Sequence, residues 1–143
     1  MNMKDERQFV GYSKYRSRLV DGHVHTELCP HGSGDRTAMM IEKAIELRIE
    51  KVCLTEHAPL PIAFAAEYGG DKKAYDTASL KLNEVDTYLE LGRQLQRAYG
   101  THIDISLGFE VDYIPGFESD IQEFLDRYGP LTDDNILSVH FME

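Results

Sequence analysis

The sequence lacks a long apolar stretch, and this absence excludes membrane proteins of the helical class. No segment approaches the run of about 20 apolar residues that a membrane-spanning helix needs. The first residues, MNMKDERQFVGYSKYRSRL, contain no apolar core of a secretion signal. We therefore expect no membrane partner and a cytoplasmic location.

Cysteine and basic residues are also scarce. The two cysteines, Cys29 and Cys53, stand far apart without a CxxC pair, which argues against a disulfide framework or a zinc ribbon and favours reduced thiols. The 143 residues include 25 acidic and 15 basic side chains, a net charge of −10. A nucleic-acid binder needs a basic face for the phosphate backbone, so we expect no nucleic-acid partner. A small phosphorylated substrate remains compatible, because a metal site supplies positive charge locally.

Strand and helix patterns alternate along the chain. Strand patterns cover residues 18–25, 51–56, 103–110 and 135–140, and helix patterns cover 36–48, 78–99 and 117–128. This alternation predicts βα units and a parallel sheet, either open or part of a barrel. Between the second strand and the second helix, residues 58–76 are rich in proline and glycine. We predict that this loop has no regular element, is the most mobile internal segment and acts as a lid or wall for the substrate.

The third predicted strand favours the barrel. Its small or polar side chains share one face and its apolar side chains share the other, because side chains alternate along a strand. The first face holds Asp104, Ser106, Gly108 and Glu110, and the second holds Ile103, Ile105, Leu107 and Phe109. The apolar face can pack under helices, whereas the small polar face suits a tight barrel interior that ends in a polar site.

Histidines concentrate where the predicted strands end. A single histidine at a strand end is usually only solvated or capped, but here every predicted strand ends in histidine or glutamate. In a (β/α) barrel these ends converge at one rim, where active sites are built. Imidazoles and carboxylates bind zinc, manganese or iron, so we predict a metal site. The predicted ligands are His23, His25, His31, His57, Glu110 and His140.

Several neighbouring residues have alternative interpretations. Asp21 shares a strand face with the first two histidines, and Asp112 follows Glu110; either carboxylate can orient a ligand histidine instead of binding metal. Glu56 points away from that face if its strand continues, so a structural ion pair explains it at least as well as a chemical role. Cys29 is a soft ligand type, yet a small buried thiol is the better interpretation.

Four segments carry a family resemblance. DGHVHTELCPHGS, LTEHAPLP, GFEVDY and SVHF resemble, in order and spacing, the motifs of the polymerase and histidinol phosphatase (PHP) superfamily, and most closely its monofunctional histidinol-phosphatases. The similarity runs from about Arg18 to Met142. The HxH element alone is weak, because amidohydrolase barrels share it, but its combination with CPHGS and TEHAPLP is specific.

The resemblance implies an α/β fold, the distorted (β/α)7 barrel, with three divalent metal ions (zinc, manganese or iron) at its rim. By motif position, His23 and His25 with Glu110 hold one ion, His31 and His57 a second, and His140 with Glu110 a third. The implied reaction is hydrolysis of L-histidinol phosphate to histidinol and phosphate in histidine biosynthesis. Clustered cations bind phosphate and activate water, so no side-chain nucleophile is assigned.

The chain departs from the family after His140. Family members supply another histidine and an Asp-x-His from the second half of the barrel, and this sequence contains neither there. A (β/α) barrel typically has about 250 residues, so we expect residues 1–143 to be the N-terminal half of one PHP domain, truncated at its C-terminus. Two alternatives stay open: a PHP phosphoesterase that acts on nucleotides or DNA ends, and a catalytically incomplete metal-binding fragment.

Overall fold

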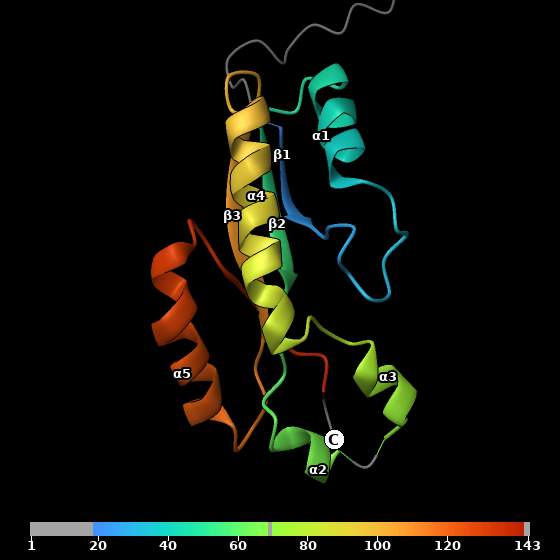
Figure 1. The fold of residues 1–143 in the computed structure, drawn as a ribbon, viewed down its shortest axis with the longest axis vertical. Coiled ribbons are helices and arrows are strands. Elements are labelled where there is room, and N and C mark those ends of the chain that lie inside the picture. Colours follow the sequence, from blue (N-terminus) through green and yellow to red (C-terminus); the bar gives the residue numbers. More distant parts are fainter. Residues whose placement is uncertain (1–18, 69, 142–143) are drawn as a thin grey trace, which may run out of the picture.

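A parallel sheet forms the centre of the structure, a computed structural model that describes residues 19–68 and 70–141. In this part of the chain the sheet has four strands in the order β1-β2-β3-β4, and all neighbouring strands are parallel. The strands are β1 (Val20–Val24), β2 (Lys51–His57), β3 (Asp104–Asp112) and β4 (Ile136–Ser138). The sheet curls into half of a barrel (Figure 1), which confirms the predicted α/β half-barrel.

Helices connect the strands and cover one face of the sheet (Figure 1). The three longest in the described residues are α1 (Thr37–Glu46), α4 (Val85–Tyr99) and α5 (Glu118–Tyr128). Each of them lies within one of the three predicted helices. The shorter helical turns are α2 (Phe64–Glu67), α3 (Lys72–Asp76), η1 (Leu82–Glu84) and η2 (Gly129–Leu131). No helix in the described ranges has the length and apolar character that would let it cross a membrane.

Two predictions for the region between β2 and α4 were wrong. The helix predicted from residue 78 begins at Val85, because tertiary hydrogen bonds hold the preceding segment against β2: the Leu80 amide donates to the His57 carbonyl at 3.3 Å, and the Leu60 amide donates to Ser79 Oγ at 3.4 Å. The loop predicted for 58–76 contains α2 and α3, and Asp71 caps α3 by accepting from the Lys73 amide. The predicted strand start at residue 18 and the residue at position 69 lie outside the described residues.

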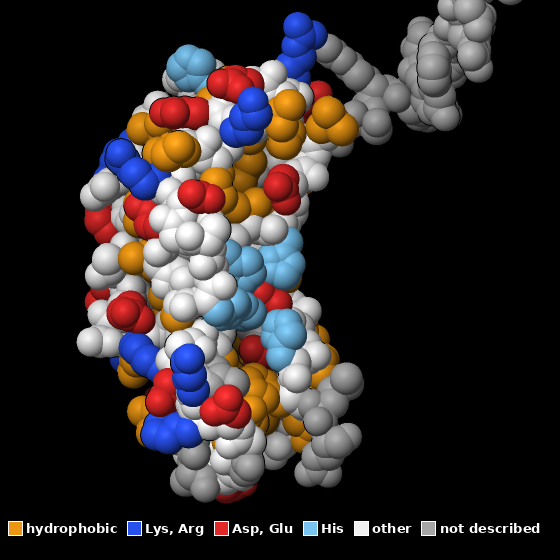
Figure 2. Space-filling model, turned by 90° about the vertical axis from the view of Figure 1, so that its right-hand side faces the viewer, with side chains coloured by type: hydrophobic (Ala, Val, Ile, Leu, Met, Phe, Trp, Pro, Cys, Tyr) orange, Lys and Arg blue, Asp and Glu red, His pale blue; other side chains and the backbone are white. Residues whose placement is uncertain are grey.

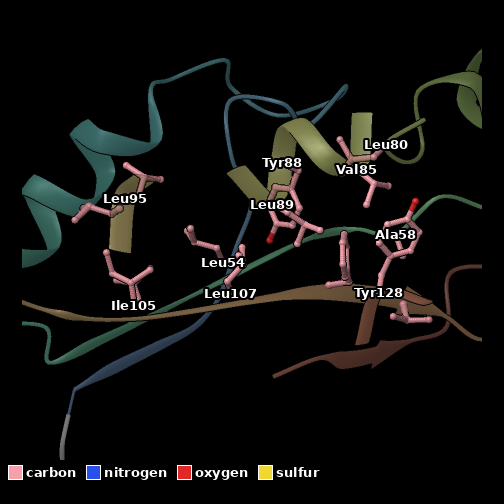
Figure 3. Close-up of a cluster of buried hydrophobic side chains, with 14 of the residues drawn as sticks. Leu54, Ala58, Leu80, Val85, Tyr88, Leu89, Leu95, Ile105, Leu107 and Tyr128 are labelled. Carbon is pink, nitrogen blue, oxygen red and sulfur yellow. The ribbon is translucent and has the colours of Figure 1, made fainter. Parts of the chain in front are cut away.

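The predicted apolar face of β3 packs under the helices. Leu107 and Phe109 are fully buried, within the hydrophobic cluster that joins β2, β3 and α4 (Figure 3). Helix α4 comes so close to β3 that a Cβ on Gly92 would overlap the Leu107 side chain. From α4, the buried Tyr88 hydroxyl donates to the Gly108 carbonyl at 2.5 Å and accepts from the Glu56 amide at 3.3 Å. Helix α4 is therefore bonded to both central strands just before their carboxyl ends.

The opposite face of β3 also follows the predicted alternation. Ser106 and Glu110 are buried there, and only Asp104 at the start of the strand is exposed. A Cβ on Gly108 would overlap the backbone carbonyl of Asp134. Glycine at this position therefore lets the segment before β4 cross β3 closely, which places β4 beside the carboxyl end of β3.

Candidate metal centre

Five histidines gather in a hollow on the concave side of the half-barrel. Figure 2 shows their side chains side by side with acidic side chains among them. His57 lies at the centre: its ring centroid is 4.5 Å from that of His25, 5.0 Å from that of His31 and 5.4 Å from that of His140. His23 joins through His25, with 5.0 Å between centroids. The structure thus brings together the five histidines that the sequence analysis singled out.

Three possible ligand atoms form a tight triangle at the end of β1. His23 Nε2 lies 2.8 Å from Glu110 Oε2 and 3.0 Å from His25 Nε2, and His25 Nε2 lies 3.1 Å from the same carboxylate oxygen. The ligand atoms of a tetrahedral zinc ion at its usual bond lengths are separated by about 3.3 Å. The triangle therefore needs only small adjustments to hold one divalent ion.

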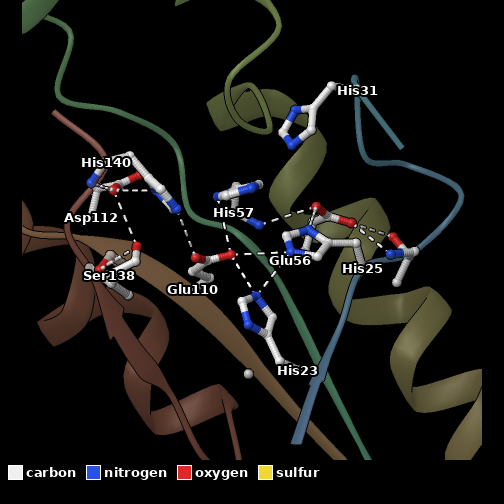
Figure 4. Close-up of polar contacts among 12 residues, drawn as sticks. His23, His25, His31, Glu56, His57, Glu110, Asp112, Ser138 and His140 are labelled. Carbon is white, nitrogen blue, oxygen red and sulfur yellow. Dashed lines mark hydrogen bonds and ion pairs between the residues drawn. The ribbon is translucent and has the colours of Figure 1, made fainter. Parts of the chain in front are cut away.

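Glu110 is the carboxylate on which the imidazoles converge (Figure 4). It is 2% exposed, and His57 Nδ1 and His140 Nε2 each lie 3.4 Å from one of its oxygens. Burial raises the pKa of Glu110, but the hydrogen bond from His23 and the nearby imidazoles outweigh burial and lower this pKa below its usual value. Glu110 is therefore a buried anion surrounded by imidazole nitrogens, as a bridging metal ligand would be.

One buried nitrogen supports the fit to a metal directly. His57 Nδ1 has no hydrogen-bond partner among the described residues, although the side chain is only 8% exposed. Burial lowers the pKa of His57, and this effect outweighs the nearby Glu110 carboxylate. A buried polar atom without a partner is costly. A cation at this nitrogen would satisfy it, so the donor set fits a divalent metal.

The other two histidines are oriented from behind by oxygen acceptors. His31 Nδ1 lies 2.8 Å from the Thr77 carbonyl oxygen, and His140 Nδ1 lies 2.7 Å from Asp112 Oδ1. Because these oxygens accept hydrogen bonds, the neutral form of each ring carries its proton on Nδ1 and leaves the Nε2 lone pair available for a metal. Asp112 thus makes the orienting contact considered from the sequence, although its oxygen also lies within 4.8 Å of ligand atoms of His57 and His140.

Glu56 turns toward the site. Its side chain is fully buried, and Oε1 lies 3.0 Å from His25 Nδ1. Burial raises the pKa of Glu56, but the hydrogen bonds from His25 and Thr26 outweigh burial and lower this pKa to about 2. The hydrogen bond to Glu56 is also the main cause that raises the pKa of His25.

Two other residues considered from the sequence differ in their distance from the cluster. Cys29 is a buried thiol, as interpreted, and burial raises the pKa of this thiol. Its Sγ lies within 4.8 Å of ligand atoms of His25 and Glu56. Asp21 is exposed on β1, before an irregularity in the pairing with β2, and no hydrogen bond joins it to the cluster within the described part of the chain.

Sequence reasoning missed the groups that hold the two orienting carboxylates, Glu56 and Asp112, and the ring of His31 in place. Thr26 donates to Glu56 through both its amide and its hydroxyl, and Ser138 Oγ donates to Asp112. Thr26 adjoins His25 in the sequence, and this position was a weak indication that its hydroxyl lies near the site. The Thr77 carbonyl offered none, because every residue has one and only the fold determines where it points.

The domain is similar to proteins of one known family. A family model of the PHP domain matches residues 21–143. The chain belongs to the PHP domain family. This PHP domain is 41% identical over 122 residues to the histidinol-phosphatase of Bacillus subtilis strain 168, covering 85% of this chain and 44% of that protein. The predicted family is therefore confirmed.

Two solved structures resemble this PHP domain. A Listeria monocytogenes structure assigned as a histidinol phosphatase is 44% identical with a TM-score of 0.85, and the match covers 87% of this chain and 46% of that one. The histidinol phosphate phosphatase of Lactococcus lactis subsp. lactis Il1403, complexed with Zn, L-histidinol and phosphate, is 26% identical with a TM-score of 0.65, and 87% of this chain covers 41% of that one. This PHP domain thus spans less than half the length of the relatives that it matches.

Proposed function

We propose that this PHP domain carries the N-terminal metal ligands of a phosphomonoester hydrolase that converts L-histidinol phosphate and water to L-histidinol and phosphate. The observation that carries the proposal is the convergence of imidazole nitrogens from β1, β2 and the segment after β4 on one buried carboxylate, Glu110. The similar Lactococcus structure, complexed with Zn, L-histidinol and phosphate, supports the same substrate here.

The three ions that the family resemblance implies would divide these ligands among them. The triangle of His23, His25 and Glu110 suits one ion. His31 and His57, whose ring centroids are 5.0 Å apart, suit a second. A third ion would use His140 with the other Glu110 oxygen, 3.4 Å away. Glu110 would then bridge two ions.

The chain's own groups prepare this site for a phosphate ester. Bound divalent ions supply positive charge for the phosphate oxygens and lower the pKa of a water molecule to near neutral. The Thr77 carbonyl and Asp112 hold the protons of His31 and His140 on the nitrogens that face away. Glu110 holds its negative charge in a buried position, which keeps the imidazoles directed at one point. No side chain is assigned as the nucleophile.

We infer that ligands beyond the described residues complete this cluster. The side chains of His23 and His140 are each 49% exposed, and six protein ligands for three ions fall short of the three or four that each zinc ion usually takes from protein. Without the additional ligands, the 143-residue chain should bind metal weakly and turn over slowly.

The test is phosphate release by the purified chain, supplied with manganese or zinc, beside the longer B. subtilis relative. We expect metal-dependent release from L-histidinol phosphate that exceeds release from nucleoside monophosphates and is much slower than that of the relative. A preference for nucleotides or DNA 3′-phosphates would instead favour another PHP phosphoesterase activity. Turnover equal to that of the relative would refute the inference of missing ligands.

A further inference from the structure

Glu56 has an unusual environment for a carboxylate at the end of a strand. Its alternation with Val52 and Leu54 assigns it to the face of β2 that the helices cover, where these neighbours belong to the hydrophobic core. Its side chain is 0% exposed. In residues 19–68 and 70–141 its ion-pair partner is a histidine and not a lysine or arginine. Burying a charge in this way is costly unless its hydrogen bonds are complete.

Each oxygen of Glu56 accepts two hydrogen bonds from residues beside the proposed metal site. Oε1 accepts from His25 Nδ1 at 3.0 Å and from the His57 amide at 3.1 Å. Oε2 accepts from the Thr26 amide at 2.9 Å and from the Thr26 hydroxyl at 2.7 Å. One carboxylate therefore ties the segment after β1 to the end of β2, and it contacts two residues that we propose as ligands (Figure 4).

The hydrogen bond from His25 to Glu56 determines which ring nitrogen of His25 carries the proton. His25 lies between two carboxylates, with Glu56 Oε1 3.0 Å from Nδ1 and Glu110 Oε2 3.1 Å from Nε2. A carboxylate only accepts hydrogen bonds, and Glu110 Oε2 already has a closer donor in His23 Nε2 at 2.8 Å. In neutral His25 the proton therefore belongs on Nδ1. The lone pair of His25 then lies on Nε2, which faces Glu110 and His23 at 3.1 and 3.0 Å. Thr26 prevents the carboxylate from turning away, because its two donors hold the other oxygen.

We propose that Glu56 is a positioning residue of the metal site, which fixes the tautomer and ring orientation of His25 and holds it in register with His57. This inference rests on the proposed function, because it takes His25 as a metal ligand. Loss of such an orienting partner typically costs about 10–100-fold in metal affinity. A merely structural carboxylate would contribute to folding alone.

The first experiment needs neither metal nor a substitution. A long-range proton–nitrogen NMR spectrum of the metal-free chain, at a pH high enough to keep imidazoles neutral, reports which nitrogen of His25 carries the proton. We expect Nδ1–H in the wild type and a mixture of both tautomers in Glu56→Gln, where Thr26 and His25 compete for one carbonyl oxygen. Predominant Nε2–H in the wild type would overturn the proposal.

The second experiment is a double-mutant cycle on zinc affinity, measured by competition with a chromogenic chelator. Glu56→Gln should weaken zinc binding by about 10–100-fold when His25 is present and should change it by no more than about twofold in the His25→Ala background. Glu42→Gln is the matched control, since Glu42 is an exposed carboxylate that accepts a hydrogen bond from Tyr99. It should leave zinc affinity unchanged.

The outcomes separate this inference from the proposed function. Equal losses in both backgrounds, or wild-type affinity in Glu56→Gln, would overturn the positioning role even if the chain is a phosphatase. A wild-type chain that binds no zinc would refute the proposed function, and the tautomer measured without metal would still decide whether Glu56 holds His25.

Discussion

Replacing Gly108 with alanine should destabilise the fold and loosen the metal site together. The new Cβ would overlap the carbonyl oxygen of Asp134 and lie 2.6 Å from its carbonyl carbon. The obstacle is backbone, so no change of rotamer relieves it. The segment before β4 must move away from β3, and His140, two residues beyond the end of β4, must move with it.

The hydrogen bonds at this crossing set the magnitude. They are the Asp133 amide to the Leu107 carbonyl at 2.7 Å, the Leu107 amide to the Asp133 carboxylate at 2.9 Å, and the Phe109 amide to the Asn135 side-chain carbonyl at 2.8 Å. Each is worth about 1 kcal/mol net, so losing all three costs about 3 kcal/mol. Glycine-to-alanine gains of about 0.4–1 kcal/mol in the unfolded chain partly offset this loss. We expect a net destabilisation of about 2–3 kcal/mol.

Urea unfolding at neutral pH measures this loss, and zinc affinity reports the displacement of His140. The matched control is Gly22→Ala, because Gly22 is exposed, has an ordinary φ and has no atom within 4 Å of a built Cβ. It should change stability by less than about 0.5 kcal/mol. If Gly108→Ala unfolds at the same urea concentration as the control, the close crossing of β3 does not determine the position of β4.

Three further predictions follow from the site and its surroundings. The double variant His23→Ala/His25→Ala should carry less bound metal by elemental analysis after metal-supplemented expression, and unchanged metal content would refute the ligand assignment. Residues 58–76 should be the first internal segment cut in limited proteolysis, and histidinol phosphate with metal should protect them; equal cleavage with and without ligand would argue against a lid. Burial opposes ionisation of Asp133, but hydrogen bonds from the Leu107 amide and from Gln96, together with the nearby Arg93 guanidinium, lower its pKa. Because this pKa is lower in the folded state, Asp133 adds stability above the unfolded pKa of aspartate that is lost as pH falls through the folded pKa. Urea unfolding should therefore show the advantage of wild type over Asp133→Asn shrinking on acidification; a constant difference would contradict it.

Most of the fold could be predicted from the alternation of side chains along the strands and from the parallel arrangement of the strands. The faces of β3 follow from a period of two, and the convergence of His57 and Glu110 follows because parallel strands end at the same edge. The start of α4 at Val85 was not predictable from local pattern, since the Leu80 amide bonds to the end of β2 instead of continuing a helix.

The sequence was sufficient to predict which histidines gather at the candidate site, but not how the side chains there are oriented. Residue type and strand ends were enough to select the five histidines, whose rings the structure places side by side. The direction of Glu56 was not, because strict alternation points it toward the helices while the Thr26 donors turn its carboxylate toward His25. The placement of His31 depends on a backbone carbonyl at Thr77, 46 residues away. That the gathered residues bind metal stays a prediction.

The Tyr88 hydroxyl links the two strands that carry two of the proposed ligands. It bonds to the Glu56 amide on β2 and to the Gly108 carbonyl on β3, one and two residues before His57 and Glu110. An ordinary tyrosine is already neutral in the pH range where imidazoles gain or lose a proton. Burial raises the pKa of Tyr88 further, so the hydroxyl remains a donor on the alkaline side as well. A change of pH that alters the charge of the imidazoles therefore leaves this link between β2 and β3 in place.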